Sequence, residues 1–238
     1  MDPVRAPDLR AALDADTVGL LERAGRLAEE RKTEVFLVGG LVRDLFLGVG
    51  AVDLDLVVAG DGPAFARRLA DVLGGEVEVY DRFLTATVTC PDLPRLDVAT
   101  ARLETYERPG ALPHVKPAGL AEDLKRRDLT INAMAVDLRP GRFGALVDPF
   151  GGAADVAAGL IRLLHARSLT DDPTRILRMA RYASRFEFVA EPRTREWLHE
   201  ALAARVLEFV SGDRLRQEVF LALHEPEPAA AFAWLRDA

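Results

Sequence analysis

Two aspartates two residues apart, Asp53 and Asp55, are the side chains of this sequence best suited to hold a metal ion. They lie in VDLDLVV (52–58), a valine-rich run typical of a β-strand. Residues i and i+2 of a strand point to the same face, so the two carboxylates should lie side by side. Two like charges so close repel each other unless a cation lies between them, and hard oxygen ligands suit Mg²⁺. A solvent-facing pair on a strand would also explain DLD alone.

A third acid, Asp97, lies in RLDVATAR, which is also strand-like. If its strand joins the same sheet, three carboxylates meet, as two-metal phosphoryl transfer requires, with the metals ~3.5–4 Å apart. We therefore predict that Asp53, Asp55 and Asp97 are catalytic. We further predict that Asp53 and Asp55 are metal ligands and that two Mg²⁺ ions are the cofactors.

The segment GGLVRD (39–44) precedes these strands and reads as a strand-to-helix turn. Gly39 and Gly40 would let backbone N–H groups approach a polyphosphate, and the N-terminus of the following helix favours negative charge. Arg43 could add a forked contact to phosphate oxygens. An ordinary turn before a helix is the alternative explanation.

A third segment, KRRDLTINA (125–133), combines charge with polar groups. Arg126 and Arg127 supply positive charge, and Asp128 and Asn132 could bind ribose hydroxyls. A capped helix start with solvated arginines is the structural alternative.

The fourth segment, DDPTRILRMARYASRF (171–186), is predicted to be one helix with Pro173 in its first turn. At 100° per residue, Asp172 and Arg175 lie about 60° apart, and Arg178 and Arg181 continue on the neighbouring arc. A carboxylate accepts from an exocyclic amine and an arginine donates to ring acceptors, so this face could select a base. A solvated charged face is the alternative.

The rest of the sequence indicates an α+β fold: a small β-sheet with helices, followed by an all-helical part. A helix is expected at 16–31, strands at 34–40, 52–58, 83–89 and 95–101, a helix at 61–73, and a loop at 107–119. Beyond residue 150, helices are expected near 171–187, 192–209, 213–223 and 227–236. We therefore expect a head domain at 1–150 and a helical neck domain at 151–238.

Composition is that of a globular protein, with 49% hydrophobic and 29% charged residues. The net charge of −7 argues against nonspecific nucleic-acid binding by the whole surface, although residues 160–216 carry 11 arginines against 8 acids. Cys90 is the single cysteine, which excludes an intramolecular disulfide and a cysteine-rich zinc site. With no membrane-spanning run and no secretory signal in the sequence, we expect a cytoplasmic protein with no membrane partner.

The four motifs, in this order, resemble the class II tRNA nucleotidyltransferases and the related bacterial poly(A) polymerases, which belong to the polymerase-beta-like superfamily. The resemblance covers about residues 34 to 190. It implies a head that holds metals on Asp53 and Asp55, and a neck in which Asp172 and Arg175 select CTP and then ATP, with Arg178 and Arg181 nearby. It also implies triphosphate and ribose contacts from Gly40, Arg43, Arg127 and Asp128, beside the Gly39 and Asn132 contacts expected above.

The expected reaction is template-independent addition of CMP or AMP from CTP or ATP to the 3′ end of tRNA, with release of pyrophosphate and no DNA partner. Asp171 stands where the CCA-adding members more often have Glu, and the body and tail domains of the family are expected to be absent. The loop at 102–122 is not shortened, which argues against addition of CC alone, and it is similar to enzymes that add only the terminal A. A poly(A) polymerase and a catalytically weak, truncated RNA- or nucleotide-binding module are the alternatives.

Overall fold

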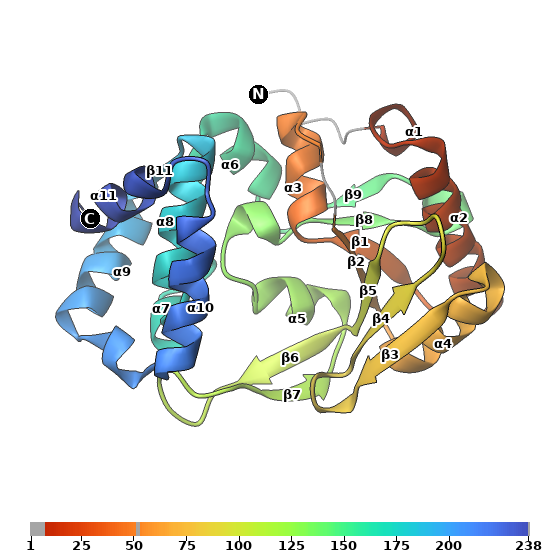
Figure 1. The fold of residues 1–238 in the computed structure, drawn as a ribbon, viewed down its shortest axis with the longest axis horizontal. Helices are drawn as coiled ribbons and strands as arrows, with labels where there is room; N and C mark the ends of the chain where they lie inside the picture. Colours follow the sequence, from red (N-terminus) through yellow and green to blue (C-terminus); the bar gives the residue numbers. More distant parts are fainter. Residues whose placement is uncertain (1–7, 51–52, 238) are drawn as a thin grey trace. The chain divides into compact units, whose positions relative to one another are not determined.

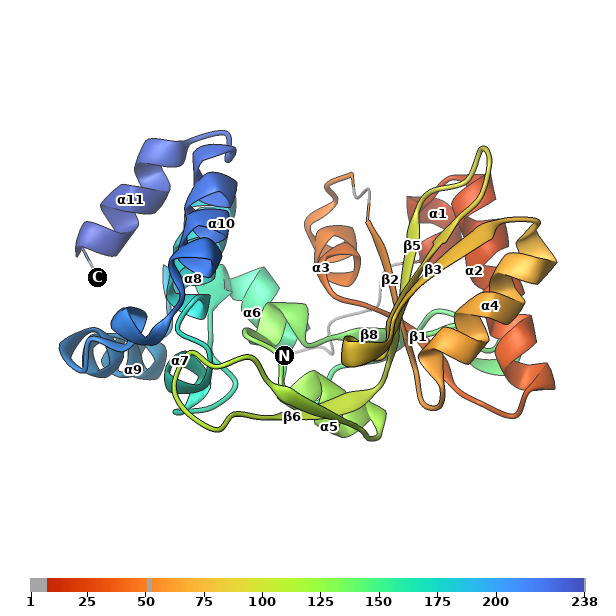
Figure 2. The ribbon, with the colours of Figure 1, turned by 60° about the horizontal axis from the view of Figure 1, so that its bottom comes forward.

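A computed structural model describes residues 8–50 and 53–237 (Figures 1 and 2). The chain forms two compact units that are not contiguous in sequence. The first contains the residues up to Leu103 together with Val115–Arg127 and Asn132–Ala154. The second contains Glu104–His114, Asp128–Ile131 and the residues from Asp155 onward. The segments 104–114 and 128–131 therefore belong with the helical unit, although both precede residue 150.

The first unit is built on a seven-stranded mixed sheet in the order β3-β4-β5-β2-β1-β8-β9. Its strands are β1 (Val35–Val38), β2 (Leu54–Val58), β3 (Glu76–Tyr80), β4 (Thr85–Thr89), β5 (Leu96–Thr100), β8 (Ala135–Asp137) and β9 (Ala145–Val147). Strands β2 and β5 run parallel, and the other neighbouring pairs whose register is resolved are antiparallel. The central strands β1 and β2 are almost wholly buried, because their valines and leucines face helices on both sides.

Helices cover both faces of this sheet. The helices α2 (Ala15–Glu30) and α4 (Gly62–Leu73) lie together along one face (Figure 2). On the other face Leu124 of α5 (Leu120–Lys125) packs with Phe36, Val38 and Val57. Residues 55 and 57 share a face of β2, so Asp55 lies on the α5 side of the sheet. The remaining elements are α1 (Leu9–Ala12), α3 (Gly40–Leu47), η1 (Asp81–Phe83), η3 (Pro140–Arg142) and α6 (Gly152–Ala158), the last crossing into the second unit.

The second unit is mainly helical. It contains α7 (Ser168–Asp171), α8 (Arg175–Phe186), α9 (Pro192–Ala203), η4 (Val206–Phe209), α10 (Gly212–Leu223) and α11 (Pro228–Asp237), with η2 (Thr130–Asn132) at its edge. A parallel pair of two-residue strands, β10 (Leu160–Ile161) and β11 (Val189–Ala190), joins two of its segments. A further two-stranded sheet pairs β6 (Arg102–Thr105) with β7 (His114–Pro117). In the part of the chain that the structure describes, no helix has the length and apolar character needed to span a bilayer.

The α+β class expected from the sequence is confirmed, but several boundaries differ. The predicted strand 52–58 begins at Leu54, and Val52 lies outside the described residues. The predicted loop 107–119 contains β7, and the helix predicted at 192–209 ends at Ala203. Strand β3 was not predicted, although its Glu76 and Glu78 alternate with valines, which is the pattern of a half-exposed strand.

The helix predicted at 171–187 is two helices. Asp172, the residue before Pro173, is extended (φ −134°, ψ 94°), as the proline ring requires of its predecessor. Helix α7 therefore ends at Asp171 and α8 begins at Arg175. This corrects the prediction that Asp172 and Arg175 lie on one helix.

Candidate active site

Two of the predicted acids lie directly opposite each other on the sheet. The parallel register of β2 and β5 pairs Asp55 with Asp97, and β4 extends the row by pairing Thr87 with Asp97. On the other side, Asp55 pairs with Val38, the last residue of β1. Asp53 precedes β2 by one residue and is exposed. Asp55 and Asp97 are thus brought together on neighbouring strands, as expected, whereas Asp53 lies just before β2 and not on the strand face predicted for it.

The charges around Asp55 compete. Burial raises the pKa of Asp55; the Arg127 guanidinium opposes that shift, and the charges of Asp97 and Asp53 add to it. The net effect is a raised pKa, so the ionised carboxylate is held where its surroundings disfavour its charge. A site of this kind gains most from an additional cation.

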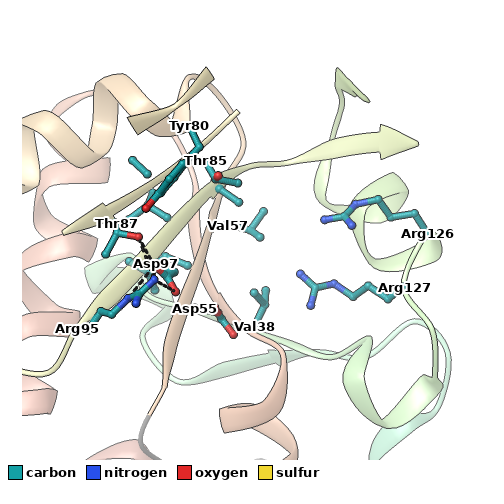
Figure 3. A pocket seen from close by; sticks show the side chains of 14 residues that line it. Val38, Asp55, Val57, Tyr80, Thr85, Thr87, Arg95, Asp97, Arg126 and Arg127 are labelled. Carbon is teal, nitrogen blue, oxygen red and sulfur yellow. Dashed lines mark hydrogen bonds and ion pairs between the residues drawn. The ribbon is translucent and has the colours of Figure 1, made fainter. Parts of the chain in front are cut away.

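Asp97 already has partners in this structure (Figure 3). The Thr87 hydroxyl donates to its Oδ1 at 2.5 Å, and the Arg95 Nη2 lies 3.1 Å from the same oxygen. Neither Thr87 nor Arg95 was predicted from the sequence. The signal available was the alternation of β4 and the position of Arg95 two residues before Asp97, which puts both on one face of the strand.

The glycine turn lies against the acids. Gly39 has φ +78° and precedes α3; a Cβ on it would lie 3.2 Å from Asp55 Oδ2 and 3.7 Å from Arg127 Nη1. The residue at this position must therefore be small and tolerate a left-handed φ. Gly40 begins α3, so the backbone N–H groups of the helix start lie beside Asp55. The predicted phosphate cradle and the predicted metal ligands are thus neighbours.

Arg43 points inward rather than into open solvent. Its side chain is 4% exposed, its Nη1 donates to Asn132 Oδ1 at 2.7 Å, and its Nη2 lies 2.8 Å from Asp44. Two predicted nucleotide contacts, Arg43 and Asn132, therefore contact each other and join α3 to the segment that follows α5.

A buried carboxylate holds the two arginines after α5. Asp123 is fully buried and accepts from Arg126 Nη2 at 2.7 Å and from Arg127 Nη2 at 2.9 Å. Burial opposes its ionisation, but the charges of Arg127 and Arg126 prevail and lower the pKa of Asp123. Sequence reasoning missed Asp123, although its spacing of three and four residues from the arginines is the one that brings helical side chains together.

A cavity of about 390 Å³ opens between these groups, and Arg126 and Arg127 extend toward the strands from its far side (Figure 3). Within residues 8–50 and 53–237, no cluster of three His, Cys, Asp or Glu side chains is close enough to hold a metal ion. The donor set nevertheless fits a hard divalent cation. Carboxylate oxygens are the ligands that such a cation prefers. The acidic neighbours of Asp55 raise its pKa, and Arg127 and Arg95 are the groups that balance the negative charge in this structure.

The sequence was compared with known protein families. The model of the poly(A) polymerase head domain matches residues 35–162, more than half of the chain. The chain belongs to the poly(A) polymerase head domain family.

Individual relatives match almost the whole chain. An A-adding tRNA nucleotidyltransferase of Halalkalibacterium halodurans is 44% identical over 94% of the chain. A solved CCA-adding enzyme in an apo form has a TM-score of 0.92, with 40% identity over 96% of the chain. The Thermotoga maritima CCA-adding enzyme complexed with tRNA has a TM-score of 0.87, with 38% identity over 100% of the chain. The chain spans about half the length of these three proteins, namely 53%, 54% and 55%.

Asp128 and Arg178, both predicted to contact the nucleotide, form an ion pair inside the second unit. Asp128 is 6% exposed, and its Oδ2 accepts from Arg178 Nε at 2.8 Å. The charge of Asp128 raises the pKa of Arg178 further above its ordinary value. The pair also fixes the start of the LTINA segment, because Asp128 Oδ1 accepts from the Leu129 N–H at 2.8 Å.

Asp172 and Arg175, the predicted base-selecting residues, form hydrogen bonds with different partners. Asp172 accepts from the Thr174 hydroxyl at 2.7 Å and from Arg214 Nη2 at 2.8 Å. Arg175 is 6% exposed and donates to the Ser168 hydroxyl at 2.6 Å. Arg214 also donates to the Gly110 carbonyl at 3.0 Å, so one arginine links Asp172 to the segment 104–114.

Arg181 is buried with acids. Its side chain is 8% exposed, and it donates to Glu218 at 2.9 Å and to Glu225 at 3.1 Å. Arg178 and Arg181 lie one turn apart on α8, as predicted, and both form ion pairs with Glu218 of α10. Arg178 pairs in addition with Asp128, and Arg181 pairs in addition with Glu225 in the turn after α10.

Proposed function

We propose that this chain adds CMP or AMP from CTP or ATP to the 3′ end of tRNA without a template, and releases pyrophosphate. The observation that carries the proposal is the pairing of Asp55 with Asp97 on parallel strands, with Asp53 preceding and the Gly39 turn alongside. The names of the A-adding and CCA-adding relatives support it, and so does the tRNA complex of one of them.

Nucleotidyltransferases of this class normally use divalent metals, and we propose Mg²⁺, as two ions. Asp53 and Asp55 would hold them, with Asp97 as the third catalytic acid. When bound, the ions would neutralise the charge that develops on the phosphoryl group.

The chain's own residues prepare the substrates. The acceptor 3′ oxygen forms a bond to the α-phosphorus, the bond from that phosphorus to the pyrophosphate oxygen breaks, and the proton of the 3′ hydroxyl is released to solvent. The N–H groups at Gly39 and Gly40 suit the polyphosphate, and Arg127 balances its charge beside Asp55. Arg43 and Asn132, joined by their hydrogen bond, would hold the turn and the ribose-binding segment together.

We assign phosphoryl transfer to a head at 1–150 and base selection to a neck at 151–238. In the neck, Asp172 and Arg175 would contact the base edge, and Arg178 with Asp128 and Arg181 would complete the nucleotide-binding region. Because Asp172 precedes α8, the two side chains approach a base from different backbone segments rather than from one helical face.

Arg175→Ala is expected to reduce the preference for the proper nucleotide over UTP and GTP by roughly ten- to a hundredfold, since a good base contact contributes about 1–3 kcal/mol. The measurement is the ratio of kcat/KM values for the four nucleotides. Arg167→Ala removes an exposed arginine that pairs with Asp171 and serves as the control, with an unchanged ratio. If Arg175→Ala lowers stability and leaves nucleotide choice intact, its bond to Ser168 is structural only.

Asp123→Asn keeps the shape of the buried side chain but loses the charge that positions Arg126 and Arg127. Nucleotide affinity should fall about tenfold, because a hydrogen bond to a charged group contributes about 1.5–3 kcal/mol. Equilibrium binding of ATP measures this, and the neighbouring exposed Glu122→Gln is the matched control. Wild-type affinity in a correctly folded Asp123→Asn protein would rule out the positioning role.

The test of the proposed function is incorporation of labelled CTP or ATP into tRNAs that end before CCA, after C, or after CC. Addition to the CC-ending tRNA alone would identify an A-adding activity. The match to the poly(A) polymerase head domain favours one alternative, which is long homopolymer addition to an unrelated RNA. Failure to incorporate any nucleotide into any RNA would overturn both.

A further inference from the structure

Strand β4 carries a threonine directly opposite the proposed catalytic acid Asp97. Threonines recur at every second position of this strand, as Thr85, Thr87 and Thr89, and so share one face of it. The antiparallel register of β4 and β5 pairs Thr87 with Asp97, while Thr85 pairs with Ala99. Of these three threonines, Thr87 is therefore the one that lies beside the acid.

The Thr87 hydroxyl has one proton, and its neighbours direct that proton to Asp97 (Figure 3). The hydroxyl donates to Asp97 Oδ1 at 2.5 Å, in the short range expected when a hydroxyl donates to a carboxylate. Arg95 Nη2 lies 3.3 Å from the hydroxyl oxygen. Because a guanidinium has donors only, the hydroxyl accepts from Arg95 and keeps its own proton for Asp97.

The two carboxylate oxygens of Asp97 are held unequally. Oδ1 accepts from Thr87 at 2.5 Å and from Arg95 Nη2 at 3.1 Å, whereas Oδ2 lies 3.4 Å from the same Arg95 nitrogen. No other side chain in the described part of the chain donates to either oxygen. Thr87 therefore fixes Oδ1 and leaves Oδ2 as the oxygen that a reacting group can approach.

The threonine is the more rigid of the two donors. Thr87 is 8% exposed, and a β-branched side chain on a strand has a stiff χ1 torsion. The Arg95 side chain is 65% exposed, and ion pairs at such exposed positions contribute little. Loss of the hydroxyl would therefore let the Asp97 carboxylate turn away even with the arginine in place.

We propose that Thr87 is a positioning residue, whose hydroxyl holds Asp97 so that Oδ2 stays available at the reacting centre. The proposal rests on the proposed function, because it takes Asp97 to be a catalytic acid. In this role Thr87 contacts neither substrate and acts only through Asp97. Groups that orient the ligands of a metal site typically account for about 10- to 100-fold in activity or metal affinity.

Thr87→Val removes the hydroxyl and keeps the branched shape, whereas Thr87→Ser keeps the hydroxyl. In the full chain, Thr87→Val should lower kcat about 10- to 100-fold, and Thr87→Ser should restore most of it. The KM values for nucleotide and tRNA should stay within about twofold of the parent, because the loss is confined to the transition state. Thr89→Val, at an exposed position on the same face of β4, is the matched control. Arg95→Gln should lower kcat less than Thr87→Val does.

A double-mutant cycle tests whether Thr87 acts through Asp97. In an Asp97→Ala background, Thr87→Val should cause no further loss of kcat. Mn²⁺ binding to the chain without nucleotide, followed by electron paramagnetic resonance, repeats the cycle without catalysis. Thr87→Val should weaken this binding in the parent but not in the Asp97→Ala background.

The outcomes separate the positioning role from the proposed function. If the parent incorporates no nucleotide but the Mn²⁺ cycle shows the coupling, the proposed function fails and the positioning role stands. Equal effects of Thr87→Val in the two backgrounds, in either measurement, would overturn the role, because Thr87 would then act independently of Asp97. A Thr87→Ser protein as slow as Thr87→Val, or a larger loss in Arg95→Gln, would overturn it as well.

Discussion

Asp55→Ala should lower nucleotide incorporation about a thousandfold. The carboxylate lies between Asp97 and the Gly39 turn, and a lost metal ligand removes several kcal/mol of transition-state stabilisation. All nucleotides should be affected alike, unlike the selective effect expected at Arg175. Single-turnover incorporation at saturating Mg²⁺ measures the loss. Asp53→Ala should behave similarly, and Asp97→Ala should also reduce the rate.

Removing the charge of Asp55 should lower activity but should not lower the stability of the fold. Because the folded state raises the pKa of Asp55, its ionised form is disfavoured there at neutral pH. Its contribution to stability is full below the ordinary pKa and is lost as pH rises through the raised one. Asp55→Asn should therefore melt at the same temperature as the parent at pH 7 or at a higher one.

The control for the activity measurement is Asp71→Ala, which changes an exposed acid of α4 and should leave incorporation unchanged. Incorporation by Asp55→Ala within tenfold of the parent would refute the assignment.

Glu225→Ala is expected to destabilise the helical unit by about 3–5 kcal/mol, the usual cost of removing one partner of a buried ion pair. Glu225 is 2% exposed and accepts from Arg181 Nε at 3.1 Å and from Arg185 Nη2 at 2.6 Å. Its loss would leave Arg181 buried with Glu218 alone. Urea unfolding followed by circular dichroism measures the change, and exposed Glu227→Ala is the control.

The pH dependence of this cluster has a defined sign. Burial opposes ionisation of Glu225, but hydrogen bonds from Arg185 and Arg181 prevail and lower its pKa. The stability it contributes is present above its ordinary pKa of about 4.5 and is lost as the pH falls through the lowered value. The stability difference between the parent and Glu225→Gln should therefore shrink on acidification. A difference that is constant from pH 7 to pH 3 would contradict the ion-pair explanation.

Sequence patterns predicted the acidic end of the sheet well because strand geometry is local. Alternation along the two strands fixes which side chains share a face, such as Asp55 with Val57 on β2 and Asp97 with Ala99 on β5. The neighbours of these acids depend on contacts between segments far apart, such as Arg43 with Asn132, and no local period encodes those. The error at Asp172 has a different origin, since the restriction that Pro173 places on its predecessor outweighed the helical charge pattern.

The interleaved order of the two units has a consequence for biosynthesis. Leu129 pairs with Leu163. The Thr130 hydroxyl donates to Asp155 at 2.6 Å, and the Thr130 N–H donates to the Arg162 carbonyl, so these contacts are all with later residues. The segments 104–114 and 128–131 therefore leave the ribosome before the residues that bury them exist. Until α7 to α10 have been translated, buried side chains such as Leu129 and Ile131 remain exposed to solvent and to chaperones. A nascent chain stalled near residue 150 should hold a sheet that is complete in sequence, joined to two apolar segments that have not yet met their partners.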